Sequence, residues 1–203
     1  MSYLPLFINT SEKKCLIVGG GVVASRKLIP ILKSKMKVTI VSPEISDEIK
    51  ELVKKSKNLS YQPREFKEND IQDQFLVVAA TNNEATNSLI ANVAKNKNIL
   101  VNMAENSSLG NTLIPSVVDR DPIKIAISSG GASPILTRLV KTKLETVIPY
   151  SYSKLAEIMM SYRQKVKKKF SKIIDRRNFW ESFLDGPVSE MVLSGQIDKA
   201  KKA

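Results

Sequence analysis

Three consecutive glycines near the start of the chain stand between an apolar run and an amphipathic segment, a spacing typical of dinucleotide binding. Residues Cys15 to Val18 are continuously apolar, as in a parallel strand that is covered on both faces. Gly19 permits a tight turn, Gly21 lets the backbone approach a pyrophosphate, and Ala24 stands where helix and strand must pack closely. The sequence therefore predicts a dinucleotide site, and the alternative is an ordinary turn between strand and helix.

The residues around this turn indicate how a dinucleotide would be held. Val22 and Val23 begin the next helix, whose unpaired amides and partial positive charge would face the phosphates. The second apolar strand ends at Ser42, Pro43 and Glu44, where an acidic residue usually binds the hydroxyls of the adenosine ribose. Because Ser42 occupies that position, we expect Glu44, or backbone groups of Pro43 and Glu44, to replace it. No arginine directly follows this strand, so we expect NAD rather than NADP as the cofactor.

The first 100 residues alternate strand and helix patterns, which predicts an α/β fold with a doubly wound parallel sheet of the Rossmann type. The expected strands are Cys15 to Val18, Lys37 to Val41, Leu59 to Gln62, Phe75 to Ala80 and Ile99 to Asn102, and the expected helices are Val22 to Lys35, Ser46 to Lys55 and Glu84 to Lys95. Thr81 and Asn102 lie at the ends of the last two strands, on the carboxyl edge where we expect the nicotinamide.

The pattern changes after this sheet. Two apolar segments predict paired strands, a helix follows them, and the rest of the chain has a helical pattern. The expected elements are strands at Leu113 to Val118 and Ile123 to Ser128, a helix from Pro134 to near Ile148, and a long helix at Lys154 to Ile174 with shorter ones after it. We therefore expect a nucleotide domain at residues 1–111, a connecting strand-helix region at 112–148 and a small all-helical domain at 149–203.

The composition excludes several kinds of catalysis. The chain has no histidine, so a histidine triad, a histidine proton shuttle and a histidine-ligated metal are excluded. Cys15 is the single cysteine, which excludes an internal disulfide and a cysteine-cluster metal site. We predict no metal site. No signal-peptide pattern and no apolar run near the ~20 residues of a membrane span are present, so we expect a soluble, cytoplasmic protein.

The formal net charge of +12 is typical of proteins that bind nucleic acid, anionic membranes or acidic small molecules. It belongs either to a solvated, lysine-rich helix face or to a surface that holds a polyanionic substrate. Much of it lies in the second half of the chain, at Lys165, Lys167, Lys168, Lys169, Lys172, Lys199, Lys201 and Lys202.

Several strings of residues occur together, and in the same order, in one known family. They are YLPLF at 3–7, GGGVVASRK at 19–27, AAT at 79–81, VN at 101–102, IPSVVDRDP at 114–122, ISSGGASPIL at 127–136, VKKKF at 166–170 and RRNFWE at 176–181. In these strings the chain resembles the precorrin-2 dehydrogenases of the siroheme-synthase N-terminal type, some of which also act as sirohydrochlorin ferrochelatases. The resemblance covers nearly the whole chain.

The resemblance implies oxidation of precorrin-2, a reduced tetrapyrrole with eight carboxylate side chains, by NAD to give sirohydrochlorin. It also implies a homodimer in which residues 112–148 form much of the interface. A polycarboxylate tetrapyrrole as substrate would account for the positive charge. We therefore expect neither nucleic acid nor a membrane as a partner.

The resemblance also suggests roles for single residues. Glu105 stands where the family has its catalytic aspartate, so we expect it to act as a general base whose pKa burial would raise, and the alternative is a solvated loop carboxylate. Ser129 corresponds to a functional serine, and Ser128 and Gly130 would bind a substrate carboxylate, unless the serines only cap the next helix. Arg138 would pair with a propionate or acetate, or belong to the dimer contact.

Two other functions stay open beside the dehydrogenase. One adds insertion of ferrous ion into sirohydrochlorin, against which the absence of histidine and cysteine ligands argues. The other is an NAD-sensing regulator that binds DNA through its basic helices, although those helices show no helix-turn-helix spacing.

Overall fold

The computed structural model describes residues 3–200. The chain forms two compact units, divided between Ile114 and Pro115. The first unit holds a parallel sheet, and the second holds a hairpin followed by helices. The finer division at residues 111 and 148 that the sequence suggests stays a prediction.

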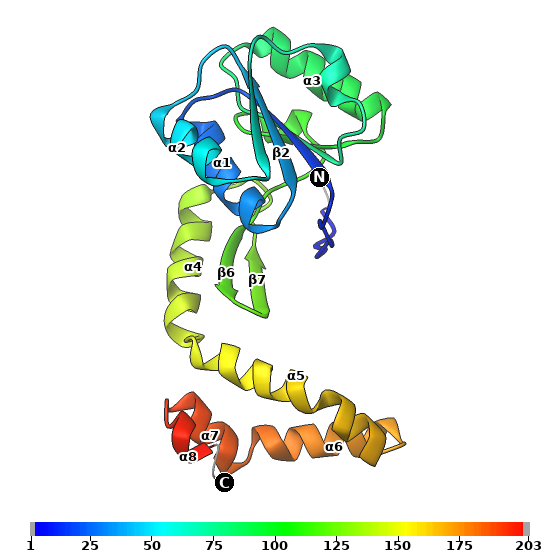
Figure 1. The fold of residues 1–203 in the computed structure, drawn as a ribbon, viewed down its shortest axis with the longest axis vertical. Helices are drawn as coiled ribbons and strands as arrows, with labels where there is room; N and C mark the ends of the chain where they lie inside the picture. The colour runs from blue at the N-terminus through cyan, green and yellow to red at the C-terminus, as the bar shows by residue number, and fades with distance from the viewer. Residues whose placement is uncertain (1–2, 201–203) are drawn as a thin grey trace. The chain divides into compact units, whose positions relative to one another are not determined.

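The first unit is a doubly wound fold in which helices surround a parallel sheet (Figure 1). The sheet has five strands in the order β3-β2-β1-β4-β5. Its elements are β1 (Lys14–Val18), α1 (Val22–Lys33), β2 (Lys37–Ser42), α2 (Asp47–Lys55), β3 (Leu59–Pro63), η1 (Glu68–Ile71), β4 (Leu76–Ala79), α3 (Glu84–Asn96), β5 (Leu100–Met103) and η2 (Ser107–Leu109). The eight strands and helices expected here are confirmed, with ends shifted by no more than two residues.

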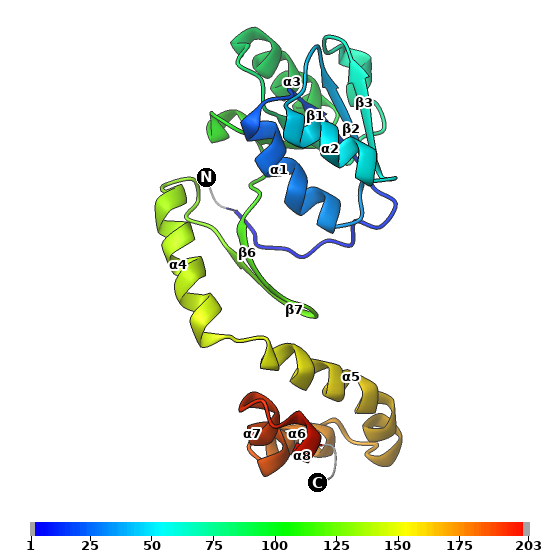
Figure 2. The same cartoon turned by 60° about the vertical axis from the view of Figure 1, so that its left-hand side comes forward.

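Helices cover both faces of this sheet, which is why its interior strands β1 and β4 are apolar along almost their whole length. On one face α1 and α2 contribute Leu28 and Ile49 to the core, and on the other α3 contributes Ile90 and Ala94 (Figure 2). All four side chains are fully buried and therefore removed from water. The sheet is therefore a rigid platform for the loops at its ends.

The centre of the sheet contains a change of direction. β1 and β4 are neighbours, but the chain leaves β1 toward α1 on one face and leaves β4 toward α3 on the other. In open α/β sheets a crevice forms at such a point, outside the carboxyl ends of the strands, and ligands bind there. Gly19 follows β1 and Ala80 follows β4, so the glycine turn begins at this point.

In the second unit, Arg120 joins a hairpin to a helix. The hairpin consists of β6 (Ser116–Arg120) and β7 (Ile123–Ile127), and α4 (Pro134–Val147) packs against it (Figure 1). The Arg120 guanidinium is buried and donates to the carbonyl oxygens of Ile148 at 2.8 Å and Glu145 at 3.1 Å. These carbonyls close α4 and lack partners within the helix. The arginine of the VDR string therefore caps α4.

The remaining helices correct one expectation. They are α5 (Ser151–Lys169), α6 (Ile173–Leu184), α7 (Pro187–Leu193) and α8 (Ile197–Ala200). The single helix expected from Lys154 to Ile174 is wrong, because the helix ends at Lys169 and a new one begins at Ile173. Phe170 leaves α5 with an extended backbone, and its ring lies 5.5 Å from that of Phe179 in α6. This contact stabilises a break that helical periodicity does not reveal.

Candidate functional site

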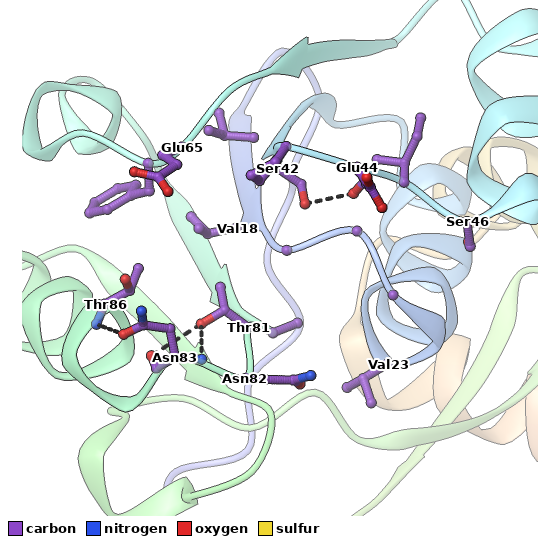
Figure 3. Close-up of a pocket in the computed structure, with 18 of the residues that line it drawn as sticks. Val18, Val23, Ser42, Glu44, Ser46, Glu65, Thr81, Asn82, Asn83 and Thr86 are labelled. Atoms are coloured by element: carbon purple, nitrogen blue, oxygen red, sulfur yellow. Dashed lines mark hydrogen bonds between the residues drawn. The ribbon is translucent and has the colours of Figure 1, made fainter.

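A cleft of about 790 Å³ lies in the first unit, outside the carboxyl ends of β1, β2 and β4 (Figure 3). Its lining residues come from the loops that follow the first four strands: Val18, Gly19, Gly20, Gly21, Val22, Val23, Val41, Ser42, Pro43, Glu44, Ile45, Ser46, Glu65, Phe66, Ala80, Thr81, Asn82, Asn83 and Thr86. Of the expected cofactor residues, Ala24 is buried in the core and Asn102 lies outside this lining, whereas Gly19, Gly21, Val22, Val23, Ser42, Pro43, Glu44 and Thr81 belong to it.

The three glycines of the turn differ in the space that a side chain would have. Gly19 has a φ of +111°, and a Cβ there would lie 2.2 Å from the carbonyl oxygen of Ala80. A Cβ on Gly20 would lie 2.0 Å from the carbonyl oxygen of Glu44. Gly21 has a φ of −84°, which any residue adopts, and a Cβ there would have nothing within 4 Å. The fold requires the first two glycines, whereas the third leaves open space in the cleft.

The amino end of α1 fits a dinucleotide. Gly21 is the N-cap residue of this helix, and it has no side chain that could accept a capping hydrogen bond from the first-turn amides. The amides of Val22 and Val23 are therefore among the first-turn donors without a partner inside the helix. A pyrophosphate accepts hydrogen bonds from such amides and is attracted by the positive end of the helix dipole. The open position at Gly21 and the uncapped helix end both suit this group.

The loop after β2 is fixed against the glycine turn. The Ser42 hydroxyl donates to the carbonyl oxygen of Glu44 at 2.7 Å (Figure 3). The Ser46 amide donates to the carbonyl oxygen of Gly20 at 2.8 Å. The proton of Ser42 is thus used inside the loop, and the Glu44 carboxylate is exposed at the cleft.

Thr81 is oriented by the start of α3. Its hydroxyl accepts from the Asn83 amide at 3.2 Å and donates to Oδ1 of Asn87 at 2.8 Å. The side-chain amide of Asn87 donates back to the Thr81 carbonyl oxygen at 2.9 Å. Asn83 caps α3 by accepting from the Thr86 amide at 2.9 Å. The wall of the cleft next to β4 is therefore a connected set of hydrogen bonds (Figure 3).

Asn102 has a structural task in β5. Its neighbours Val101 and Met103 pack on the α3 face of the sheet, so the alternation of a strand directs Asn102 to the α1 face. The side chain is 2% exposed and donates to the Thr112 carbonyl oxygen at 3.0 Å, while its Oδ1 has no hydrogen-bond partner within the described part of the chain. Its role in binding the nicotinamide stays a prediction.

Glu105 lines a smaller cavity of about 200 Å³, together with Glu84 and Asn87. Asn87 is also the hydrogen-bond partner of Thr81, so this pair stands between the small cavity and the large cleft. Glu105 is exposed, and the burial that the sequence led us to expect is not provided by the first unit among its described residues. Its role as a general base stays a prediction.

Four expected site residues belong to the second unit: Ser128, Ser129 and Gly130 in the glycine-serine loop, and Arg138 on α4. The Ser129 hydroxyl accepts from the Ser133 amide at 3.0 Å and donates to the Ser133 carbonyl oxygen at 3.2 Å. Ser128 accepts from the amide of Gly130 at 3.1 Å, and Gly130 has a φ of +66°. Arg138 is exposed on α4. Both serines stabilise the turn into α4, and the substrate roles of all four residues stay predictions.

Sequence reasoning missed one side of the cleft. Glu65 and Phe66 follow β3 and line the cleft, but the sequence analysis did not name them. Their position at the cleft could have been predicted from the sequence, because both residues follow a strand and the carboxyl ends of parallel strands lie at one edge of a sheet. The other lining residues that it did not name as site residues are Val18, Gly20, Val41, Ile45, Ser46, Ala80, Asn82, Asn83 and Thr86.

Residues 3–200 lack the groups that protein-bound metal or thiol chemistry needs. No group of three or more histidine, cysteine, aspartate or glutamate side chains there could hold a metal ion. Burial raises the pKa of the Cys15 thiol to about 12, so this thiol is not a nucleophile. None of the described helices is both long enough and apolar enough to span a membrane.

Three family models match successive parts of the chain. The model described as NAD(P)-binding matches residues 6–116, which contain the cleft. The model described as sirohaem biosynthesis protein central matches residues 120–146, and the one described as sirohaem synthase dimerisation region matches residues 151–203. The first model covers more than half of the chain, which therefore belongs to that NAD(P)-binding family, and the other two models match its sirohaem-related parts. The family resemblance found in the sequence is thereby confirmed.

Curated siroheme synthases are similar to this chain over almost its whole length. A siroheme synthase of Vesicomyosocius okutanii subsp. Calyptogena okutanii (strain HA) is 42% identical over 99% of this chain, which covers 43% of that relative. One of Ruthia magnifica subsp. Calyptogena magnifica is 43% identical over 99% of this chain, which covers 42% of it. The chain thus spans less than half the length of these curated relatives. A solved structure described as SirC, precorrin-2 dehydrogenase, superposes with a TM-score of 0.75 at 27% identity, covering 97% of this chain and 100% of that chain.

The family match bears on assembly. The model named for dimerisation falls on residues 151–203, the helices α5 to α8, whereas the sequence analysis expects much of the interface at residues 112–148. A dimerisation region is thus present in the chain, and the share of the interface contributed by residues 112–148 stays a prediction.

Proposed function

We propose that this chain is a precorrin-2 dehydrogenase that uses NAD to form sirohydrochlorin. The observation that carries the proposal is the match to the solved precorrin-2 dehydrogenase, which covers 97% of this chain and 100% of that chain rather than the nucleotide fold alone. The cleft adds support, because its open Gly21 position and uncapped helix end suit a dinucleotide.

The residues of the first unit would hold NAD along the cleft. The amides that follow Gly21 would bind the pyrophosphate, the loop after β2 would meet the adenosine half, and Thr81 would meet the nicotinamide half at the end of β4. Bound NAD supplies one chemical capacity, acceptance of a hydride from the macrocycle. The hydrogen bonds of Thr81 and Asn87 keep that wall of the cleft in one arrangement, which favours a fixed reaction geometry.

Conversion of precorrin-2 to sirohydrochlorin removes a proton as well as a hydride. We propose that the carboxylate of Glu105 accepts this proton from the substrate. Glu105 follows β5 at the same edge of the sheet as the cleft. The exposed carboxylate would release this proton to water. Glutamate retains the acid-base chemistry of the aspartate that the family has at this place, and the added methylene changes only its reach.

The substrate and the assembly follow from the same proposal. A tetrapyrrole with several carboxylates suits a chain of net charge +12. Arg138 and the loop of Ser128 and Ser129 are our candidates for contacts with those carboxylates, in the manner of charge-assisted hydrogen bonds. We also propose a homodimer, which the match of residues 151–203 to a dimerisation region supports.

Anaerobic incubation with precorrin-2 and NAD tests the proposal through the Glu105 variants. We expect Glu105→Ala to lower turnover by about a hundredfold or more, the usual contribution of a general base, and Glu105→Asp to retain most of it. Glu84→Ala is the matched control, because Glu84 lines the same small cavity without an assigned role. Equal losses in Glu84→Ala and Glu105→Ala, or full activity of Glu105→Ala, would reject Glu105 as the base.

A further inference from the structure

The cleft contains two carboxylates and, among the described residues that line it, no lysine or arginine. The carboxylates belong to Glu44, in the loop after β2, and Glu65, in the segment after β3 (Figure 3). A dinucleotide with a phosphate on the adenosine ribose needs a cation at this place, whereas a ribose diol needs an acceptor such as a carboxylate. The lining therefore has the charge that suits NAD.

The position that usually carries the ribose-binding acid is occupied differently here. Ser42 ends β2, and its hydroxyl donates to the Glu44 carbonyl oxygen at 2.7 Å. That donor is used within the loop, and a serine has no charge with which to oppose a phosphate. The acid must therefore be one of the two carboxylates that line the cleft, Glu44 or Glu65.

Glu65 is held at the cleft by the residues on both sides of it. Arg64 donates to the two carboxylate oxygens of Asp70 at 2.8 and 2.7 Å and to the carbonyl oxygen of Glu65 at 2.9 Å. Phe66 packs against the core on the α3 face of the sheet. The backbone of Glu65 is thus fixed at the carboxyl edge, while its side chain is exposed. An acceptor whose backbone is already ordered loses less entropy when it binds.

The cations of this segment are not available to a ribose phosphate. The Arg64 guanidinium is engaged by Asp70 and by Gln62, and Lys67 is outside the lining of the cleft. The pairing register aligns Ser42 with Pro63, so Glu65 lies two residues past the partner of Ser42. Glu65 therefore approaches the end of β2 from the neighbouring strand.

We propose that Glu65 is the residue that selects NAD over NADP, by accepting from the ribose hydroxyls and repelling a 2′-phosphate. This inference rests on the proposed NAD-dependent function and adds a specificity residue to it. It assigns to the segment after β3 the task that the sequence pattern assigns to Glu44.

Equilibrium binding of NAD and NADP to the full chain tests this assignment without any turnover. We expect Glu65→Gln to weaken NAD about tenfold, the usual effect of losing a hydrogen bond to a charged group, and to weaken NADP less. Glu65→Arg should then prefer NADP. The same order should hold for the fragments 5′-AMP and adenosine 2′,5′-bisphosphate, which isolate the ribose end. Glu68→Gln, an exposed carboxylate of the same segment outside the lining, should bind both dinucleotides like the unaltered chain.

The outcomes separate this inference from the function on which it rests. If the unaltered chain prefers NAD and Glu65→Gln keeps the same ratio of NAD to NADP affinity, the assignment is refuted while the proposed function stands. Collapse of the ratio in Glu44→Gln but not in Glu65→Gln refutes it equally. Binding of neither dinucleotide by the unaltered chain contradicts both. Thermal unfolding of each variant shows that it is folded.

Discussion

Replacement of the first-turn glycines by alanine should destabilise the fold at Gly19 and Gly20 but not at Gly21. At Gly19 an alanine adopts a strained φ of +111° and places its Cβ 2.2 Å from the Ala80 carbonyl oxygen. Backbone strain of about 1–3 kcal/mol and overpacking of about 1–3 kcal/mol then add to a loss of about 2–6 kcal/mol in the free energy of unfolding. Gly20→Ala should also destabilise, because its Cβ would lie 2.0 Å from the Glu44 carbonyl oxygen.

Gly21→Ala should leave the fold intact and weaken the binding of the cofactor. Alanine is a poorer N-cap than glycine, which lowers the free energy of unfolding by several tenths of a kcal/mol to about 1 kcal/mol. Alanine also restricts the unfolded chain, which raises the free energy of unfolding by about 0.4–1 kcal/mol. The free energy of unfolding therefore changes by less than about 1 kcal/mol. The new Cβ enters open space in the cleft, and loss of one charged hydrogen bond to the pyrophosphate weakens NAD about ten- to hundredfold. Gly21→Val should weaken it further.

Urea titration and calorimetric titration with NAD measure the two quantities on the same protein samples. The reasoning fails if Gly21→Ala binds NAD as tightly as the unaltered chain, because the pyrophosphate would then not lie against this residue. It fails also if Gly21→Ala lowers the free energy of unfolding as much as Gly19→Ala does, because a side chain at residue 21 would then not lie in open space.

Three further predictions concern the supports of the site. Arg120→Ala should lower the free energy of unfolding by about 2–4 kcal/mol, because it leaves the carbonyls at the end of α4 without their charged, buried donor; a change below about 0.5 kcal/mol in urea would contradict this role. The Arg64 guanidinium lowers the pKa of Asp70, so the stability that Asp70 provides should be complete above its ordinary pKa of about 4 and disappear as the pH falls through the lower, folded-state value. Measured against pH, the difference between the unaltered chain and Asp70→Asn should vanish in acid, and a constant difference would exclude the pair as its source. Ser129→Ala should cost about 1 kcal/mol in thermal unfolding by opening the turn before α4, and Ser128→Ala, whose hydroxyl accepts a single amide, should cost less.

The sheet of the first unit was predictable because its signals are local. The interior strands β1 and β4 are short apolar runs, α1 has a periodic pattern, and Gly19 marks the turn after β1. The order of the loops along the sheet edge then follows from the topology, so the contribution of Ser42, Glu44 and Thr81 to the cleft could be expected.

The features that escaped prediction depend on contacts distant in sequence. Arg120 caps a helix that ends 28 residues later, and no pattern near the arginine reveals this. The end of α5 at Lys169 depends on the ring of Phe179 in the next helix. Glu65 reaches the cleft only because β3 lies beside β2 in the sheet. The role proposed for Glu105 came from family resemblance, since its exposed carboxylate has no local signal of catalysis.

The most direct test of the proposed dehydrogenase is the stoichiometry of its reaction. With precorrin-2 and NAD under anaerobic conditions, NADH and sirohydrochlorin are followed together in one sample. A hydride carries two electrons, so the account predicts one NADH for each sirohydrochlorin formed, at a rate that depends on the protein. Sirohydrochlorin formed without NADH, or no turnover by a chain that demonstrably binds NAD, would contradict it.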